Sequence, residues 1–145
     1  MPSVADLIKG RTHVYSVSKD MTVLDAARYL REKEVRATTV CSPTGEPIGV
    51  ISQSDISDKV AAENRCPAWV RIEEIMSTNL IAVTPETPLE ECLHLMERHG
   101  IYHLVVMGSD KRFCGMISAQ DLLKIVATEE KSRADMLQAW AFPPR

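Results

Sequence analysis

The chain has 145 residues and a mass of 16.2 kDa, which suits one domain or two small subdomains that share a core. Hydrophobic residues make up 45% and charged residues 26% of the sequence, and this balance argues against disorder as the main state. A formal net charge of -3 with 5% aromatic residues argues against a nucleic-acid-binding protein. No apolar run approaches the roughly 20 residues that span a membrane, and residues 1–9 show no signal peptide, so we expect a cytoplasmic protein without membrane contact.

The four cysteines lie 22 to 26 residues apart, at Cys41, Cys66, Cys92 and Cys114. This spacing excludes a zinc site built from close cysteine pairs, and the cysteine density is too low for a disulfide-rich secreted scaffold. We therefore predict free thiols in a reducing compartment and no metal site.

The sequence repeats itself when it is shifted by 66 residues. Residues 17–61 then align with residues 83–127 without a gap, and eight of the 45 aligned positions are identical. Average composition gives about three identities by chance. Residues 4–8 also resemble residues 72–76, at an offset of 68. The chain is therefore predicted to contain two copies of one unit, packed face to face about a pseudo-twofold axis, because one small unit alone buries little surface.

The first copy reads as strand, helix, strand, strand, helix. β-Branched and aromatic residues predict a strand over 13–17, and apolar residues at helical spacing predict a helix that Thr22 caps and that runs to about Glu34. The next two strands and the second helix are predicted over residues 37–41, 48–52 and 55–62.

The second copy repeats this order. Thr87-Pro88-x-Glu90 reads as a helix start with a cap, a proline at the first helical position and a capping-box glutamate. The later strands and the last helix are predicted over residues 104–107, 116–118 and 121–127. We predict a mixed α/β (α+β) fold of two pseudo-symmetric β-α-β-β-α repeats, with a first repeat at 1–66, a second repeat at 67–128 and a helical extension at 129–145.

One motif carries the most specific chemistry. Gly-Val-Ile-Ser-Gln-Ser-Asp at residues 49–55 returns as Gly-Met-Ile-Ser-Ala-Gln-Asp at residues 115–121, each time at a strand end before a helix. The helix start and the serine hydroxyl favour a phosphate, and a carboxylate one turn on can accept both hydroxyls of a ribose. Ser-x-x-Asp before a helix is also a plain capping box, so a structural role stays open beside the ligand role.

With this repeated motif the chain resembles a tandem pair of cystathionine-β-synthase (CBS) domains, called a Bateman module. The resemblance covers about residues 4 to 127 and also rests on the Val-Thr-Pro-Glu-Thr-Pro-Leu run from Val83. It implies two clefts between the repeats that bind adenosine compounds such as AMP, ADP, ATP, S-adenosylmethionine or NAD. It also implies that the module pairs into a homodimer and senses a ligand rather than catalysing a reaction.

The resemblance assigns roles by position within each motif. Asp55 and Asp121 are expected to hold the two ribose hydroxyls. Ser52 and Ser118 are expected to contact the phosphates.

The resemblance also implies a basic residue near the start of each second strand, where Arg36 and His103 stand in this sequence. If His103 touches phosphate, binding there should strengthen as the pH falls, because the imidazole becomes a cation. The segments before the first strands are expected to line the adenine, with candidate residues His13, Tyr15, Asn79 and Ile81. Many relatives carry a proline where Val105 stands here, and Thr39 takes that place in the first copy.

No catalytic motif is recognised, so we predict a stand-alone regulatory module and not an enzyme. The module requires no cofactor, and its output is expected to pass to another, unidentified protein. The alternative is a constitutive dimerisation or protein-interaction adaptor with degenerate clefts. Two tryptophans, Trp69 in the linker and Trp140 in the extension, are candidates for such contacts.

Overall fold

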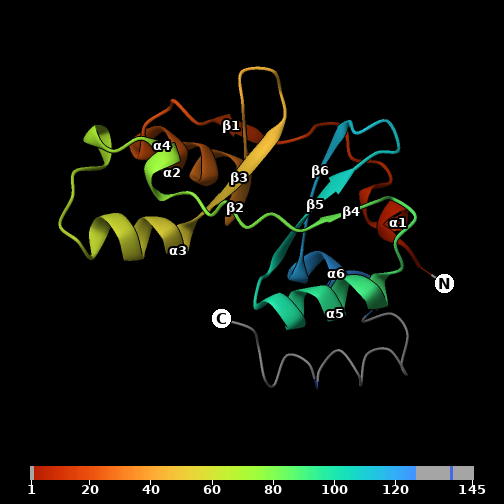
Figure 1. Ribbon diagram of the computed structural model, residues 1–145. Helices are drawn as coiled ribbons and strands as arrows, with labels where there is room; N and C mark the ends of the chain where they lie inside the picture. Colours follow the sequence, from red (N-terminus) through yellow and green to blue (C-terminus); the bar gives the residue numbers. More distant parts are fainter. Residues whose placement is uncertain (1, 127–137, 139–145) are drawn as a thin grey trace. The chain divides into compact units, whose positions relative to one another are not determined.

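The structure is a computed structural model that describes residues 2–126 and 138 (Figure 1). Its strands are β1 (Ser16–Ser18), β2 (Ala37–Cys41), β3 (Pro47–Ser52), β4 (Ala82–Val83), β5 (His103–Met107) and β6 (Phe113–Ser118). Its helices are α1 (Val4–Ile8), α2 (Val23–Lys33), α3 (Gln53–Ile56), α4 (Ile72–Ile75), α5 (Leu89–His99) and α6 (Ala119–Val126). The predicted extension at 129–145, with Trp140, lies outside the described residues apart from Gln138.

Each repeat forms one three-stranded sheet with the same topology. β1 runs parallel to β2, and β2 runs antiparallel to β3. In the second repeat β4 runs parallel to β5, and β5 runs antiparallel to β6. A parallel pair needs a crossover between its strands, and α2 and α5 supply it in their respective repeats. The prediction of a mixed α/β fold with two equivalent repeats is confirmed.

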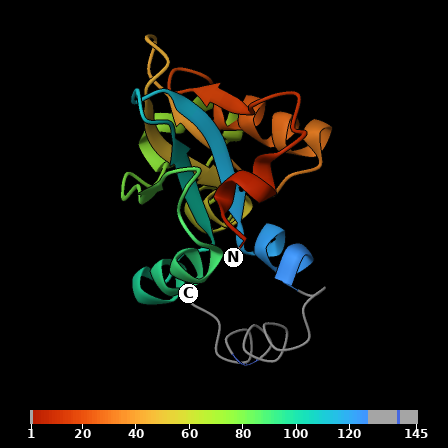
Figure 2. The ribbon, with the colours of Figure 1, turned by 90° about the vertical axis from the view of Figure 1, so that its right-hand side faces the viewer.

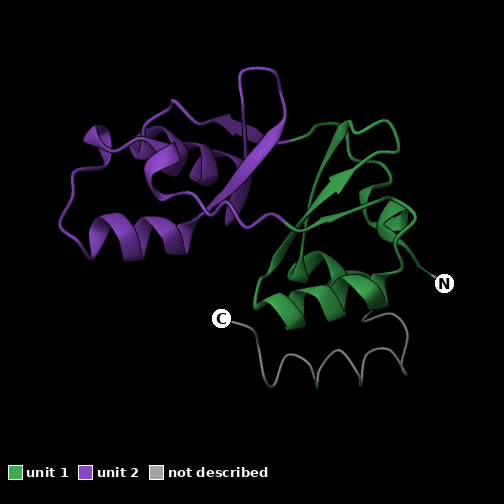
Figure 3. Ribbon diagram, in the orientation of Figure 1, with its two compact units in different colours: residues 1–14, 81–145 green, residues 15–80 purple. Residues whose placement is uncertain are grey.

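The first helix of each repeat, here called its lead helix, belongs to the compact unit of the other repeat (Figure 3). The lead helices are α1 and α4. Unit 1 comprises residues 1–14 and 81–145, and unit 2 comprises residues 15–80. In unit 1, α1 lies against β6 and α6 (Figure 2). The Val4 N–H donates to the Thr87 carbonyl at 2.9 Å, and in unit 2 the Ile72 N–H donates to the Met21 carbonyl at 2.9 Å. Each lead helix thus docks before the long helix of the other repeat, by the same hydrogen bond.

The two hydrophobic cores share many equivalent positions of the repeat. The core of unit 2 comprises Val17, Val23, Ala26, Val40, Ile51, Val60, Val70, Ile72 and Ile75. The core of unit 1 comprises Val4, Val83, Leu89, Cys92, Met96, Leu104, Val106, Ile117, Ala119 and Leu122. Burial raises the pKa of the Cys92 thiol to about 11, with a smaller contribution from Glu91, so this cysteine is a core residue and not a reactive one.

Several predicted elements differ from the structure in their bounds. The strand predicted over 116–118 begins at Phe113, and the helix predicted over 121–127 begins at Ala119. The strand predicted over 13–17 is shorter, because its ladder with β2 begins at Ser16, opposite Thr39. The helix predicted from Thr87 begins after Pro88, and Thr87 instead accepts hydrogen bonds through its carbonyl and its hydroxyl. The helix predicted over 55–62 begins earlier as α3 and continues as a π-helical turn over Ser57–Ala61.

Residues 76–80, the linker that leads from α4 of unit 2 into unit 1, approach β3 so closely that a glycine is required there. A Cβ atom on Gly49 would lie 2.7 Å from the Met76 sulfur and 2.9 Å from the Ser77 carbonyl oxygen. Ser77 and Val50 pair there through two backbone hydrogen bonds of 2.9 Å. Gly49 therefore lets the linker run along the strand that leads into the first motif.

We expect Gly49→Ala to push the linker off β3 and to lower the free energy of unfolding by about 1–3 kcal/mol, the usual cost of overpacking. Urea unfolding measures this change. The control is Gly45→Ala, where the space is open but φ is +86°, so about 1–2 kcal/mol of backbone strain is expected and no clash. If Gly49→Ala leaves the free energy of unfolding unchanged, the close approach of Met76 and Ser77 to Gly49 is contradicted.

Candidate functional site

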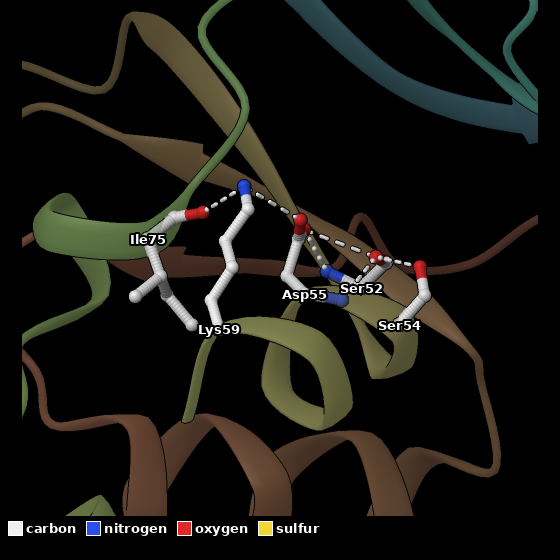
Figure 4. A network of polar contacts seen from close by, with 5 residues as sticks. All are labelled: Ser52, Ser54, Asp55, Lys59 and Ile75. Atoms are coloured by element: carbon white, nitrogen blue, oxygen red, sulfur yellow. Dashed lines mark hydrogen bonds and ion pairs between the residues drawn. The ribbon is translucent and has the colours of Figure 1, made fainter. Parts of the chain in front are cut away.

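The first motif (residues 49–55) ends in a capping box at the start of α3 (Figure 4). The Asp55 N–H donates to Ser52 Oγ at 3.2 Å. In return the Ser52 N–H and hydroxyl donate to Asp55 Oδ2 at 2.9 and 3.0 Å. The Ser52 hydroxyl also lies 2.9 Å from the Ser54 hydroxyl. Serine and aspartate are therefore fixed against each other at the edge of the sheet.

The second motif (residues 115–121) has the same geometry at the start of α6. The Asp121 N–H donates to Ser118 Oγ at 3.1 Å, and the Ser118 N–H donates to Asp121 Oδ2 at 2.8 Å. The structural role that the sequence left open is thus present in both motifs. A carboxylate offers about four lone-pair positions, so capping alone leaves room for ligand hydroxyls.

The helix starts offer fewer free N–H groups to an anion than the sequence predicts. The first helical N–H of α3, from Gln53, donates to the Arg36 carbonyl at 2.9 Å. The equivalent N–H of α6, from Ala119, donates to the Tyr102 carbonyl at 2.8 Å. Because the N–H of each motif aspartate is also bonded to its serine, side-chain cations must supply much of any anion binding.

A cation neutralises the first motif from its own helix. Lys59 Nζ lies 3.0 Å from Asp55 Oδ1 and donates to the Ile75 carbonyl at 2.8 Å (Figure 4). The Asp55 side chain is only 14% exposed, so this pair is better shielded from water than an ordinary surface ion pair. Lys59 stands in the π-helical turn, and it joins the motif carboxylate to the end of α4.

The second motif takes its cation from a different place. The residue four positions after Asp121 is Ile125, which packs against the core of unit 1 and carries no charge. Instead Arg11, from the segment after α1, places Nη2 at 3.1 Å from Asp121 Oδ2. Its Nη1 donates to the Met116 carbonyl at 2.7 Å. Each motif aspartate therefore has one basic partner, but the two partners are not equivalent in the repeat.

Sequence reasoning missed both cations. The Asp-x-x-x-Lys spacing of Asp55 and Lys59 is a recognisable helical ion-pair signal. Arg11 is 110 residues from Asp121, and no local pattern indicates their contact.

The two basic candidates at the second strands differ in kind. Arg36 is exposed and lies directly before β2. Its carbonyl accepts a hydrogen bond from the N–H of Gln53, the first residue of α3. His103 begins β5, is half-buried, and faces Ser118 across the antiparallel ladder. Burial lowers the pKa of His103 below its ordinary value of 6.5, although the nearby Asp121 carboxylate opposes this shift.

We expect the lowered pKa of His103 to make the protein less stable in mild acid. The unfolded chain binds a proton more readily than the folded chain, so stability is complete above about pH 6.5 and falls as the pH drops towards the folded pKa. In urea unfolding between pH 8 and pH 5, His103→Gln should remove part of this loss.

The control for this prediction is His94→Gln, which removes an exposed imidazole from α5. The unfolding profile of His94→Gln should follow that of the parent protein. Parallel profiles for His103→Gln and the parent would contradict the prediction.

The four residues predicted to line an adenine lie in different settings. The pairing of Ser77 with Val50 carries the linker along β3, and exposed Asn79 follows two residues later. Ile81 packs against the core of unit 1. His13 is exposed, with Nδ1 at 3.1 Å from the Thr12 hydroxyl.

Tyr15, the fourth of these residues, packs edge-on against Tyr29 with ring centroids 6.2 Å apart. The Lys33 ammonium lies over both rings. The adenine role of these four residues stays a prediction.

Within residues 2–126 and 138, no group of three or more histidine, cysteine or acidic side chains is arranged to hold a metal ion. No helix in that part of the chain has the length and apolar character needed to cross a bilayer.

Comparison with known protein families gives a double match. The model of the CBS domain matches residues 4–62 and 72–128. An uncharacterized protein of Methanocaldococcus jannaschii is 33% identical over 111 residues, covering 75% of this chain and 59% of that protein. A homoserine O-acetyltransferase of Methanohalobium evestigatum is 26% identical over 113 residues, covering 78% of this chain but 22% of the enzyme. The chain thus spans less than two thirds of the length of these curated relatives.

Solved structures share the whole fold. A protein with CBS domains from Burkholderia ambifaria is 30% identical, with a TM-score of 0.82 over 89% of this chain and 96% of that one. A CBS domain protein from Pyrobaculum aerophilum in complex with AMP is 21% identical, with a TM-score of 0.78 over 95% of this chain and 100% of that one. A CBS domain pair in complex with 5′-methylthioadenosine and S-adenosyl-L-methionine is 21% identical, with a TM-score of 0.79 over 90% of this chain and 99% of that one.

Proposed function

Because the chain belongs to the CBS domain family, we propose that it is a regulatory module that binds an adenosyl ligand at its two motifs and senses metabolite or energy state. AMP, ADP and ATP are the first candidates, and S-adenosylmethionine and NAD are the next. The module requires no cofactor for this role and catalyses no reaction. We further propose that it acts in the cytoplasm, as a homodimer, on a separate regulated protein.

One observation carries the proposal. Two carboxylates, Asp55 and Asp121, stand at the same point of two equivalent helix starts, each fixed by its serine and each beside one cation. Capping needs only one oxygen of each carboxylate, and a capping box does not need a basic partner. A fixed carboxylate with a cation nearby suits a ligand that carries a ribose diol and a phosphate.

The ligands of related structures support this reading. The Pyrobaculum protein holds AMP, and the CBS domain pair holds 5′-methylthioadenosine and S-adenosylmethionine. These compounds share an adenosine and differ in the substituent at the 5′ carbon. The proposal for this chain therefore commits to the adenosyl group and leaves the 5′ substituent to experiment.

Binding would regulate by favouring one arrangement of the chain over another. Lys59 joins Asp55 to the end of α4, which precedes the segment (residues 76–80) that leads from unit 2 into unit 1. A ribose that takes Asp55 weakens this connection, so ligand binding and the position of the linker are coupled. An anionic ligand beside His103 would bind more strongly as the pH falls.

The proposal is tested by thermal unfolding of the full chain with AMP, ADP, ATP, NAD, S-adenosylmethionine and 5′-methylthioadenosine. A ligand at 100 times its Kd should raise the free energy of unfolding by about 2.7 kcal/mol. A shift with at least one compound supports the proposal. If every compound leaves a cooperative transition unchanged, the proposal is wrong.

Trp69 favours a second candidate, the constitutive adaptor. Its side chain is 84% exposed in a short helical turn, Pro67–Trp69, and a large exposed aromatic residue is typical of a contact surface. For an adaptor, Trp69→Ala should shift the sedimentation of the protein towards a smaller species, while no adenosyl compound changes its melting temperature.

A further inference from the structure

Given the proposed function, we propose that Arg11 sets the ligand preference of the second motif, so that it selects nucleosides with an anionic 5′ substituent. Arg11 holds the second motif through two groups at once. The guanidinium donates from Nη1 to the Met116 carbonyl at 2.7 Å and from Nη2 to Asp121 Oδ2 at 3.1 Å. The arginine side chain is 36% exposed and the aspartate 27% exposed, so solvent and ligands can reach the pair.

A ribose would have to displace one half of this contact. Oδ2 of Asp121 already accepts from the Ser118 N–H at 2.8 Å and from Arg11. The Ser118 N–H is fixed by the start of α6, so a diol that spans both carboxylate oxygens must take the place of Arg11. Empty and bound states therefore differ in the partner of one guanidinium nitrogen.

Displacement does not remove the cation from the site. The other nitrogen, Nη1, keeps its hydrogen bond to the Met116 carbonyl, two residues before the serine of the motif. The freed half of a guanidinium fork then needs an anionic acceptor, and a phosphate fits its geometry. A neutral or cationic 5′ group would leave the freed Nη2 half of the guanidinium without an acceptor.

The first motif has no arginine in this position. Lys59 is a compact point charge, it donates to the Ile75 carbonyl, and it follows Asp55 on the same helix. Residue 79, which is equivalent to Arg11 at the offset of 68 that relates residues 4–8 to residues 72–76, is an exposed, uncharged asparagine. The two motifs are therefore expected to differ in ligand preference.

The experiment compares AMP with 5′-methylthioadenosine by calorimetric titration of the full chain carrying Asp55→Ala, which leaves the second motif as the binding site. Adding Arg11→Gln should weaken the binding of AMP about tenfold, because a charge-assisted hydrogen bond is lost. The same change should leave 5′-methylthioadenosine binding equal or stronger, because the competitor for Asp121 is gone. The AMP affinity of the Arg11→Lys variant should lie between that of the protein with Arg11 and that of the Arg11→Gln variant.

The matched control is Arg65→Gln, which breaks an exposed ion pair of the same length, 3.1 Å to Glu74, outside both motifs. It should change neither affinity. Equal weakening of both compounds by Arg11→Gln would make Arg11 a structural support and overturn the inference, and so would no change in either. If the Asp55→Ala protein binds neither compound, the proposed function fails at the second motif and the inference fails with it.

Discussion

Asp55→Ala and Asp121→Ala are each expected to abolish the ligand-induced stabilisation that comes from their own motif. Each carboxylate is the group that can accept both ribose hydroxyls, and alanine offers no acceptor. If both motifs bind, each single variant should retain part of the thermal shift and the double variant should retain none. At a ligand concentration of 100 Kd the loss per motif is about 2.7 kcal/mol.

Loss of a helix cap must be separated from loss of a ligand group. Asp25 is the capping-box aspartate of α2, where the Asp25 N–H donates to Thr22 Oγ1 at 3.1 Å. Asp25→Ala should destabilise the unliganded protein by about 1 kcal/mol, as the motif variants do, but keep the full ligand shift. A ligand shift that survives in the double motif variant would refute the assigned role of these carboxylates.

Alanine at either of two equivalent isoleucines is expected to cost the most folding stability. Ile51 and Ile117 lie 66 positions apart, both are fully buried, and both occupy the same place in the third strand of their repeat. Isoleucine-to-alanine changes in a packed core cost about 2–5 kcal/mol. Since a domain is stable by only about 5–15 kcal/mol, either variant should show a much lower midpoint in urea.

The comparison between the two isoleucine variants tests the repeat itself. Equivalent surroundings predict losses that agree within about 1 kcal/mol, the spread expected from different local relaxation. Val14→Ala removes an apolar side chain that is 48% exposed and should cost little. A large loss at one isoleucine and almost none at the other would contradict equivalent cores.

The sequence predicted the features that repeat. The motif at residues 49–55 and its copy at 115–121 appear as strand ends and helix starts because a serine followed by an aspartate at N3 is a local signal. The apolar positions of the long helices were also predictable, since their spacing places them on one face.

The exchange of lead helices was not predictable from the repeat. Val4 and Ile72 occupy equivalent positions, and an apolar residue there fits either core. Arg11 was missed for a related reason. A contact across 105 residues, such as that of Arg11 with Met116, depends on how the lead segment runs over unit 1 and leaves no periodicity in the sequence.

The position of the π-helical turn was likewise not predictable. Residues 55–62 have an ordinary helical pattern, whereas in the wider turn Val60 packs in the core of unit 2 and Lys59 donates to the Ile75 carbonyl, and both contacts are tertiary.

Whether the motif carboxylates bind an adenosyl ligand is tested by a calorimetric titration of the full chain and of its Asp55→Ala/Asp121→Ala variant with AMP, ATP and S-adenosylmethionine. We expect saturable binding of at least one compound to the parent protein, with one or two sites per chain, and none to the folded double variant. Binding that is equal in both proteins, or absent from a well-folded parent, would contradict this expectation.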